Sequence, residues 1–166
     1  MAGPAEMSNT AATPWPVLLL AVAVAGGLGT LARFGLGTAV GRWFAPASNA
    51  APTGPMHGFL GGVPGASPVG TLTVNAAGCL LFGLLWGWTA QREQFATWTT
   101  PELRLMVLTG FLGAFTTFST FAFETTHLMR HGHTAAALLN LLVQNAVGLT
   151  LAFAGFAIAA RWFVAD

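Results

Sequence analysis

The sequence predicts an all-α integral membrane protein that crosses the bilayer four times, with a third helix broken near its middle. Hydrophobic residues make up 54% of the chain and charged residues only 7%, whereas soluble domains carry roughly 25% charged residues. The mean hydropathy is +0.67. The 166 residues contain four apolar runs, and each run exceeds the length of about 20 residues that a transmembrane helix needs. The third run mixes glycines, hydroxyls and phenylalanines, a combination that weakens a helix.

Composition also excludes several classes of protein. The net charge is +1 and no basic cluster is present, so nothing favours a nucleic-acid partner. A single cysteine, Cys79, excludes an intrachain disulfide. Four spans and their connections use almost the whole length, so we expect one four-helix membrane domain over residues 15–166, with lipid around it.

The first predicted span covers residues 15–44 and follows a small, polar tail, residues 1–14. That tail contains no lysine or arginine. Because a signal peptide needs a positive start, we expect a disordered tail and a retained first helix. Trp15 and Trp43 stand at the two ends of the span, as in an aromatic belt. Arg33 has two open interpretations: it extends to the headgroups, or it places a positive charge at an aqueous mouth and attracts anions.

The second predicted span, residues 70–90, follows a connection over residues 45–69 that contains five prolines and is expected to be a loop. Thr71 and Asn75 lie four residues apart in this span and share one helical face. The amide of Asn75 must find hydrogen-bond partners in hydrocarbon. An interhelical hydrogen bond and a donor that faces a dehydrated ion both satisfy that need.

The third predicted span, residues 101–130, contains the stretch GFLGAFTTFSTFAFE over residues 110–124. Its glycines and hydroxyls predict a break in the helix at residues 113–117. Non-helical backbone at membrane depth is tolerated where it is buried or lines a cavity, and its carbonyls can coordinate a cation. Phe118 and Phe121 follow the break at a spacing that places them on one helical face, with hydroxyls beside them.

Glu124 is the acidic residue of this third span that lies deepest in the predicted membrane region. One interpretation pairs it with His127 or Arg130 on the same helix, at a solvated helix end. The other makes it part of an ion path together with the nearby hydroxyls. The sequence leaves both open.

The fourth predicted span covers residues 134–164. Asn140 and Gln144 lie one turn apart and form a polar stripe on this helix. The preceding His131-Gly132-His133 sequence has only two histidines and no third ligand, so we expect a water-exposed turn rather than a metal site.

The arginines of the chain divide evenly between the two sides of the membrane. Three arginines fall toward one face of the membrane and three toward the other: Arg33, Arg42 and Arg130 against Arg92, Arg104 and Arg161. The positive-inside bias therefore has almost nothing to act on. We expect insertion in both orientations and an antiparallel homodimer with a two-fold axis in the membrane plane.

Three motifs, in chain order and at matching spacing, resemble those of the Fluc/CrcB fluoride channels. They are Gly26-Gly27-x-Gly29-x-x-x-Arg33-Phe34, Gly70-Thr71-Leu72-x-Val74-Asn75-x-x-Gly78-Cys79 and Gly110-Phe111-x-Gly113-x-x-Thr116-Thr117-Phe118-Ser119-Thr120-Phe121. This resemblance implies four-helix subunits that form antiparallel dimers with two pores and export cytoplasmic fluoride passively across the inner (plasma) membrane. It further implies that Phe118 and Phe121 present their ring edges to fluoride and that Asn75 donates to the ion.

The same resemblance assigns further residues to the ion path and to a metal site. Ser119 and Thr120 would belong to a polar track, to which Asn140 of the fourth span is also assigned. A structural sodium ion would lie at the dimer centre, held by the main-chain carbonyls of Gly113 and Thr116 from both subunits.

A channel for a small anion agrees with the residue types present. Such an ion holds its water strongly, and ring edges, amides and hydroxyls replace that water without a fixed charge that would trap the ion. The chief alternative, a small dual-topology drug/proton antiporter, would need a carboxylate in the first span, and residues 15–44 contain none. An enzyme would need an oriented nucleophile and base, and Glu124 with His127 lacks the third group.

Overall fold

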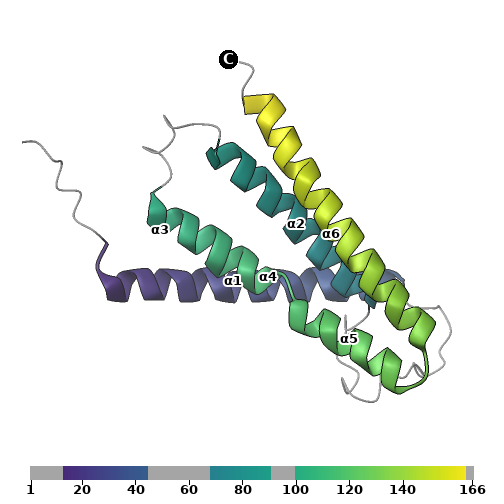
Figure 1. The fold of residues 1–166 in the computed structure, drawn as a ribbon. Coiled ribbons are helices and arrows are strands. Elements are labelled where there is room, and N and C mark those ends of the chain that lie inside the picture. Colours follow the sequence, from purple (N-terminus) through teal and green to yellow (C-terminus); the bar gives the residue numbers. More distant parts are fainter. Residues whose placement is uncertain (1–12, 45–67, 91–99, 164–166) are drawn as a thin grey trace, which may run out of the picture.

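The structure, a computed structural model, describes residues 13–44, 68–90 and 100–163. The described residues are helical, and no strand is found among them (Figure 1). In chain order the elements are α1 (Trp15–Trp43), α2 (Pro68–Ala90), α3 (Pro101–Arg104), η2 (Leu105–Leu112), α4 (Gly113–Phe115), α5 (Phe118–Arg130) and α6 (Thr134–Phe163).

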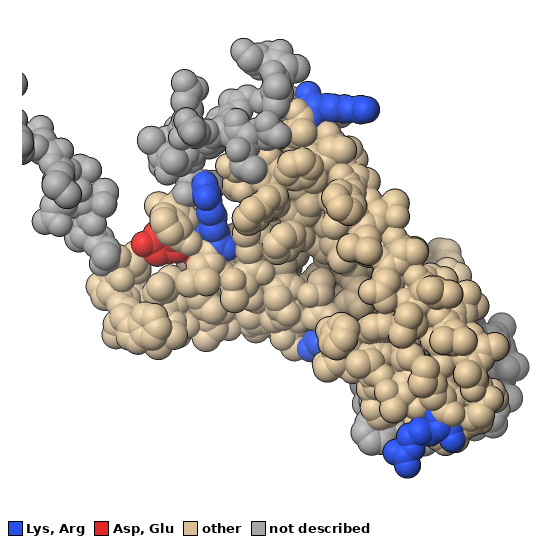
Figure 2. Space-filling view, in the orientation of Figure 1, with Lys and Arg blue, Asp and Glu red and all other residues tan. Residues whose placement is uncertain are grey.

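Within these ranges, four helical segments are long and apolar enough to cross a membrane, with α3 to α5 together forming the third. The predicted fold class is therefore confirmed. The second span begins at Pro68, two residues before the predicted start. Residues 1–12 of the tail predicted as disordered, and residues 45–67 of the predicted loop, lie outside the described residues. Figure 2 shows most of the charged side chains on this face near the two ends of the helical body, with a largely uncharged stretch between them.

Helices α2 and α6 lie side by side along most of their lengths (Figure 1). Glycines at their contact allow the two backbones to approach. A Cβ atom on Gly83 would overlap the carbonyl oxygen of Ala152, and one on Gly155 would overlap the carbonyl oxygen of Leu80. Since lipid competes equally for apolar surface, such close backbone packing is the main source of helix association in a bilayer.

Helix α1 packs mainly against the first half of the third span and crosses the other helices obliquely (Figure 1). Gly29 makes this contact possible, because a Cβ atom there would overlap the backbone of Phe111. Gly110 of the third span also allows this close approach, because a Cβ atom there would lie only 3.0 Å from the Cβ of Ala25 on α1. The outward face of α1 carries exposed leucines and valines, which suits lipid or a second copy of the chain.

The third span begins as expected and then departs from regular α-helix. The side chain of Thr100 accepts from the N–H of Leu103 (3.2 Å), with Pro101 at the first helical position. From Leu105 to Leu112 the helix is of the π type, which the sequence did not predict. Wide turns of this kind are frequent at functional sites.

The break in the third span is confirmed but is shorter than predicted. Thr116 and Thr117 have extended backbone, with ψ of 158° and φ of −144° respectively. Gly113 was expected to be part of the break, but it is helical, at φ −63° and ψ −35°. Phe115 lies before the break and packs into a small buried cluster with Val74 and Leu112.

The turn between α5 and α6 is a glycine-terminated helix end. Gly132 has a φ of 79°, a conformation that glycine adopts without strain. The N–H of His133 donates to the carbonyl of Leu128 (2.9 Å) and that of Gly132 to the carbonyl of Met129 (3.1 Å). This is the Schellman pattern. His131 and His133 are exposed, so the predicted water-exposed turn is confirmed.

Candidate functional site

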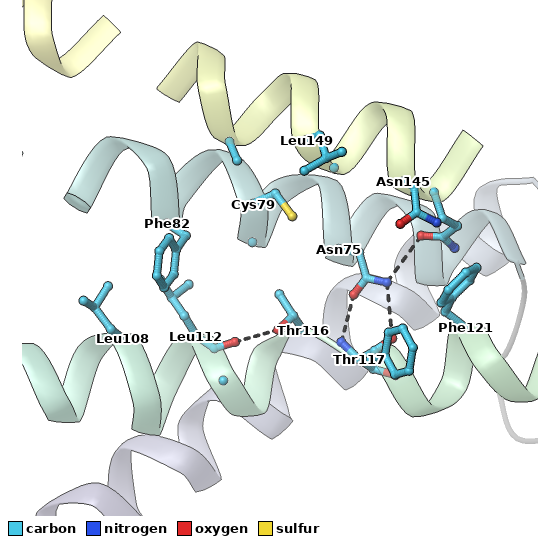
Figure 3. A pocket seen from close by; sticks show the side chains of 16 residues that line it. Asn75, Cys79, Phe82, Leu108, Leu112, Thr116, Thr117, Phe121, Asn145 and Leu149 are labelled. Atoms are coloured by element: carbon cyan, nitrogen blue, oxygen red, sulfur yellow. Dashed lines mark hydrogen bonds between the residues drawn. The ribbon is translucent and has the colours of Figure 1, made fainter. Parts of the chain in front are cut away.

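A cavity of about 410 Å³ lies beside the break in the third span (Figure 3). Residues from α2, from both sides of the break and from α6 line it. Most of its wall is apolar, and the polar groups gather at one end. The lining residues that concern the site are Asn75, Thr116, Thr117, Phe118, Phe121, Gln144 and Asn145.

Asn75 holds the extended backbone of the break through both atoms of its amide. Its Oδ1 accepts from the N–H of Thr117 (2.8 Å), and its Nδ2 donates to the carbonyl oxygen of Thr117 (3.3 Å). The same Nδ2 donates to Oε1 of Gln144 on α6 (3.3 Å), as the dashed lines in Figure 3 show. Of the two interpretations of Asn75, the structure shows the interhelical hydrogen bonds. The donor role toward an ion stays a prediction.

Two backbone carbonyls at the break lose the N–H donors that they would have in a regular helix, because side chains accept from these donors instead. In an unbroken α-helix the N–H of Thr117 donates to the carbonyl of Gly113, and that of Thr120 to the carbonyl of Thr116. Here Thr117 N–H donates to Asn75 Oδ1. Thr120 N–H donates to the side-chain oxygen of Thr117 (3.0 Å). The carbonyls that lose these donors are those of Gly113 and Thr116. They are the two that the family resemblance assigns to a cation.

Phe118 and Phe121 contact each other but have very different surroundings. Their ring centroids are 5.6 Å apart and the rings are inclined by 66°, an edge-to-face arrangement. Phe121 is buried, whereas 78% of Phe118 is exposed on the protomer. Packing within one chain therefore accounts for the position of Phe121 and leaves that of Phe118 unexplained.

The hydroxyl residues after the break do not share one environment. Ser119 is exposed and Thr120 half-buried at the start of α5. Thr117 is buried and caps α5 with its side chain, a part that the sequence analysis did not assign to it. A threonine at the last position of the predicted break, directly before the next helical segment, was the signal for such a cap.

Glu124 is completely buried, at 0% exposure, and lies against α2. Its Oε1 accepts from the hydroxyl of Thr71 (2.6 Å). Its Oε2 has no hydrogen-bond partner among the described residues. The interpretation of Glu124 as a residue of a solvated helix end was wrong, because the side chain is fully buried and hydrogen-bonded to α2. The ion-path interpretation is not tested by this geometry.

Two further predicted residues lie away from the cavity. Asn140 on α6 donates through Nδ2 to the hydroxyl of Thr125 (3.0 Å) and does not line the cavity. Arg33 is half-buried on α1, ten residues before the end of the helix at Trp43. At 1.5 Å per residue this is about 15 Å along the axis.

Sequence comparison places this site in a family. The model of the family described as "CrcB-like protein, Camphor Resistance (CrcB)" matches residues 20–156, most of the chain. The chain belongs to the CrcB-like family. The matched region of this CrcB-like chain contains every site residue described above, from Arg33 to Asn145.

Curated CrcB-like relatives carry a functional name. A protein of Nitrosococcus oceani named fluoride-specific ion channel FluC is 40% identical over 138 residues, which are 82% of this chain and 91% of the relative. Relatives with the same name from Nitratidesulfovibrio vulgaris (39% identity; 82% of this chain, 92% of the relative) and Salinibacter ruber (38%; 82% and 85%) are similar over nearly the same length.

Proposed function

We infer that this chain is a fluoride-specific ion channel, a multi-pass protein of the plasma membrane that lets cytoplasmic fluoride leave passively. Membership of the CrcB-like family carries the inference, since relatives named as fluoride channels match 82% of the chain. The family supports a channel and not the drug/proton antiporter that the sequence left as an alternative. It also agrees with the expectation that the protein is not an enzyme.

In the proposed path, fluoride passes the polar end of the cavity beside the break. Phe118 and Phe121 present the positive edges of their rings, Asn75 supplies an amide donor, and Ser119 and Thr120 continue the path as a polar track. The 78% exposure of Phe118 supports this proposal, because a large ring left outside the protomer's own packing is available to an ion. Neutral donors strip water from fluoride without holding it permanently.

Three residues outside the cavity have secondary places in this proposal. Arg33 attracts fluoride to the mouth of the path through its fixed positive charge. Asn140 extends the polar track along α6. Glu124 borders the path, and its oxygen without a hydrogen-bond partner among the described residues supports a role beyond packing.

The functional unit in this proposal is an antiparallel homodimer surrounded by lipid. The helix is interrupted at Thr116 and Thr117 in the middle of a membrane span. Beside this break, Gly113, Phe118 and Ser119 are exposed on the protomer. Irregular backbone does not face lipid in membrane proteins, so another protein surface must cover it. A second copy in the opposite orientation supplies that surface, and the even distribution of arginines permits both insertions.

A structural sodium ion at the dimer centre completes the proposal. The carbonyls of Gly113 and Thr116 fit this ion, because their helical donors are diverted to Asn75 and Thr117. A set of neutral oxygen ligands suits a hard cation rather than zinc or copper. Sodium would supply the positive charge that satisfies these carbonyls in an interior where unpaired carbonyls are costly.

Fluoride efflux from liposomes tests the function. Purified wild-type protein is reconstituted into fluoride-loaded liposomes, and release is followed with a fluoride electrode beside protein-free liposomes. We expect rapid efflux that Phe118→Ile and Phe121→Ile each reduce severely, because isoleucine keeps the apolar character and removes the partial positive charge of the ring edge. Wild-type efflux no faster than from protein-free liposomes would refute the proposed function.

Sodium replacement tests the metal site separately. After exhaustive exchange of sodium for a bulky organic cation, we expect the dimer to weaken or the flux to stop, because four carbonyls of the two copies lose their cation. Undiminished flux under these conditions would argue against the sodium site and would leave the channel function untouched.

A further inference from the structure

The end of α5 carries two histidines that the proposed channel function does not use. His127 and His131 are four residues apart, so they lie on the same face of the helix end. Their ring centroids are only 4.1 Å apart, and the rings are inclined by 37°. In the sequence His131 stands beside His133 as a pair, whereas the structure brings it together with His127.

Contacts within α5 hold both rings in place. The ring of His127 contacts that of His131 and also that of Phe123, whose centroid is 5.7 Å away. Nδ1 of His131 lies 2.8 Å from the carbonyl oxygen of His127. Since a carbonyl only accepts, Nδ1 must carry the hydrogen, and Nε2 of the neutral ring then holds the lone pair. Metal-binding histidines are oriented in this way, through a hydrogen bond at the nitrogen that does not bind the metal.

Two imidazoles at this spacing suit a divalent transition metal. Histidines four residues apart on one helix face are the ligands of zinc in helical metal motifs. A metal with bonds of about 2.0 Å and adjacent ligands at right angles holds its two nitrogens roughly 3 Å apart. Rings with centroids 4.1 Å apart reach that spacing through small side-chain rotations. His127 needs only one of its two ring nitrogens for this, so a hydrogen bond at the other is compatible with metal binding.

The surroundings of the pair allow a cation to bind with water as its other ligand. His131 is exposed and His127 half-buried, and the carboxyl end of a helix favours positive charge. Arg130 on the same turn is repulsive, but it is exposed and screened by solvent. No third histidine, cysteine or carboxylate joins the pair in the described part of the chain. The geometry therefore suits an open, exchangeable site rather than a closed structural one.

We propose that His127 and His131 form a binding site for a divalent transition metal at the end of α5, with water in the remaining positions. Cu²⁺ should bind more tightly than Ni²⁺ or Zn²⁺, because nitrogen ligands follow that order. The two histidines do not line the 410 Å³ cavity, and the inference does not rest on the proposed channel function. A bound metal would stabilise the helix end that leads into the turn at Gly132.

Copper binding to the purified, tag-free full chain in detergent tests this site. The chain has four histidines, and a His57→Asn background removes the one outside the described residues. In that background, His127→Asn and His131→Asn each remove one proposed ligand. The matched control is His133→Asn, which removes an exposed histidine of the same turn. Titration with CuCl₂ gives the affinity, electron paramagnetic resonance reports the nitrogen ligands, and thermal unfolding reports the effect on stability.

We expect saturable binding of one Cu²⁺ per chain with nitrogen ligands in the spectrum. His127→Asn and His131→Asn should each weaken binding at least about tenfold, because loss of an outer hydrogen-bond partner alone costs about 10–100-fold in metal affinity. His133→Asn should stay within about threefold of its parent. Cu²⁺ should raise the unfolding temperature of the parent and of His133→Asn, but not that of the two ligand variants, because the pair exists only in the folded helix.

Three results would overturn the inference. One is the absence of saturable Cu²⁺ binding by the His57→Asn protein. Another is an unchanged affinity in either ligand variant, which would show that the two rings do not act together. The third is a loss in His133→Asn as large as that in His131→Asn, which would place the ligands in the turn and not on the face of α5. None of these measurements uses fluoride flux, so their failure leaves the channel function standing, and an inactive channel leaves the metal site standing.

Discussion

Replacement of Asn75 tests whether this one side chain holds the break in the third span open. Asn75→Leu preserves the approximate shape of the side chain and removes three hydrogen bonds: those to the N–H and carbonyl of Thr117 and that to Gln144. Leucine offers no replacement for any of them. The extended conformation at Thr117 then loses the hydrogen bonds from α2 that hold it.

The structure allows the magnitude to be estimated. Thr117 is only 6% exposed, so its N–H would be left buried without an acceptor, at about 1–3 kcal/mol. The two bonds from Nδ2 are longer, at 3.3 Å each, and together add about 1 kcal/mol. We expect Asn75→Leu to lower the free energy of unfolding by about 2–4 kcal/mol, a large part of the roughly 5–15 kcal/mol that native proteins have.

Reversible unfolding in mixed micelles, followed by circular dichroism, measures this change, with fluoride efflux recorded on the same preparations. Asn145→Leu is the matched control, because Asn145 is exposed and its amide bonds within its own helix. Its loss should stay below about 0.5 kcal/mol. If Asn75→Leu lost no more than the control, the break would be held by something other than Asn75, and the account of the diverted carbonyl donors would fail.

Three further changes test other parts of the structure. Gly155→Ala should lower stability by about 1–3 kcal/mol, because its Cβ would lie 2.8 Å from the backbone nitrogen of Leu84. Thr71→Val should lower it by about 1–3 kcal/mol, measured in the same unfolding assay, since Glu124 loses its donor in a fully buried site. Ser48→Cys in a Cys79→Ala background, labelled from outside intact cells, should react in about half the copies, because the arginine distribution gives no preferred orientation.

Matched controls and contrary outcomes accompany these changes. Gly35→Ala has open space at its Cβ and should be neutral or slightly stabilising; equal losses at both glycines would contradict close packing as the cause. Thr73→Val removes only a hydrogen bond to Val69 of its own helix. If it lowered stability as much as Thr71→Val, the loss could not be attributed to the hydrogen bond between Thr71 and Glu124. Labelling of nearly all or nearly none of the Ser48→Cys copies would exclude dual insertion.

Composition and local pattern were enough to predict the fold class and the approximate ends of the helices. Hydrophobic run length decides how many times such a chain crosses a bilayer, because each span must satisfy its backbone internally. Local signals were equally sufficient for the start of the third span at Pro101, the turn at Gly132 and a weak helix near residues 113–117. All of these depend on residues within a few positions of one another along the chain.

The centre of the site, in contrast, depends on contacts between residues far apart in the chain. The break falls at Thr116 and Thr117 rather than at Gly113, because the acceptor for Thr117 is Asn75, 42 residues away. Glu124 is buried because Thr71, 53 residues away, reaches it from α2. Hydrogen bonds between helices choose among local conformations of similar energy, and only the packing of α2, α5 and α6 brings these partners within reach.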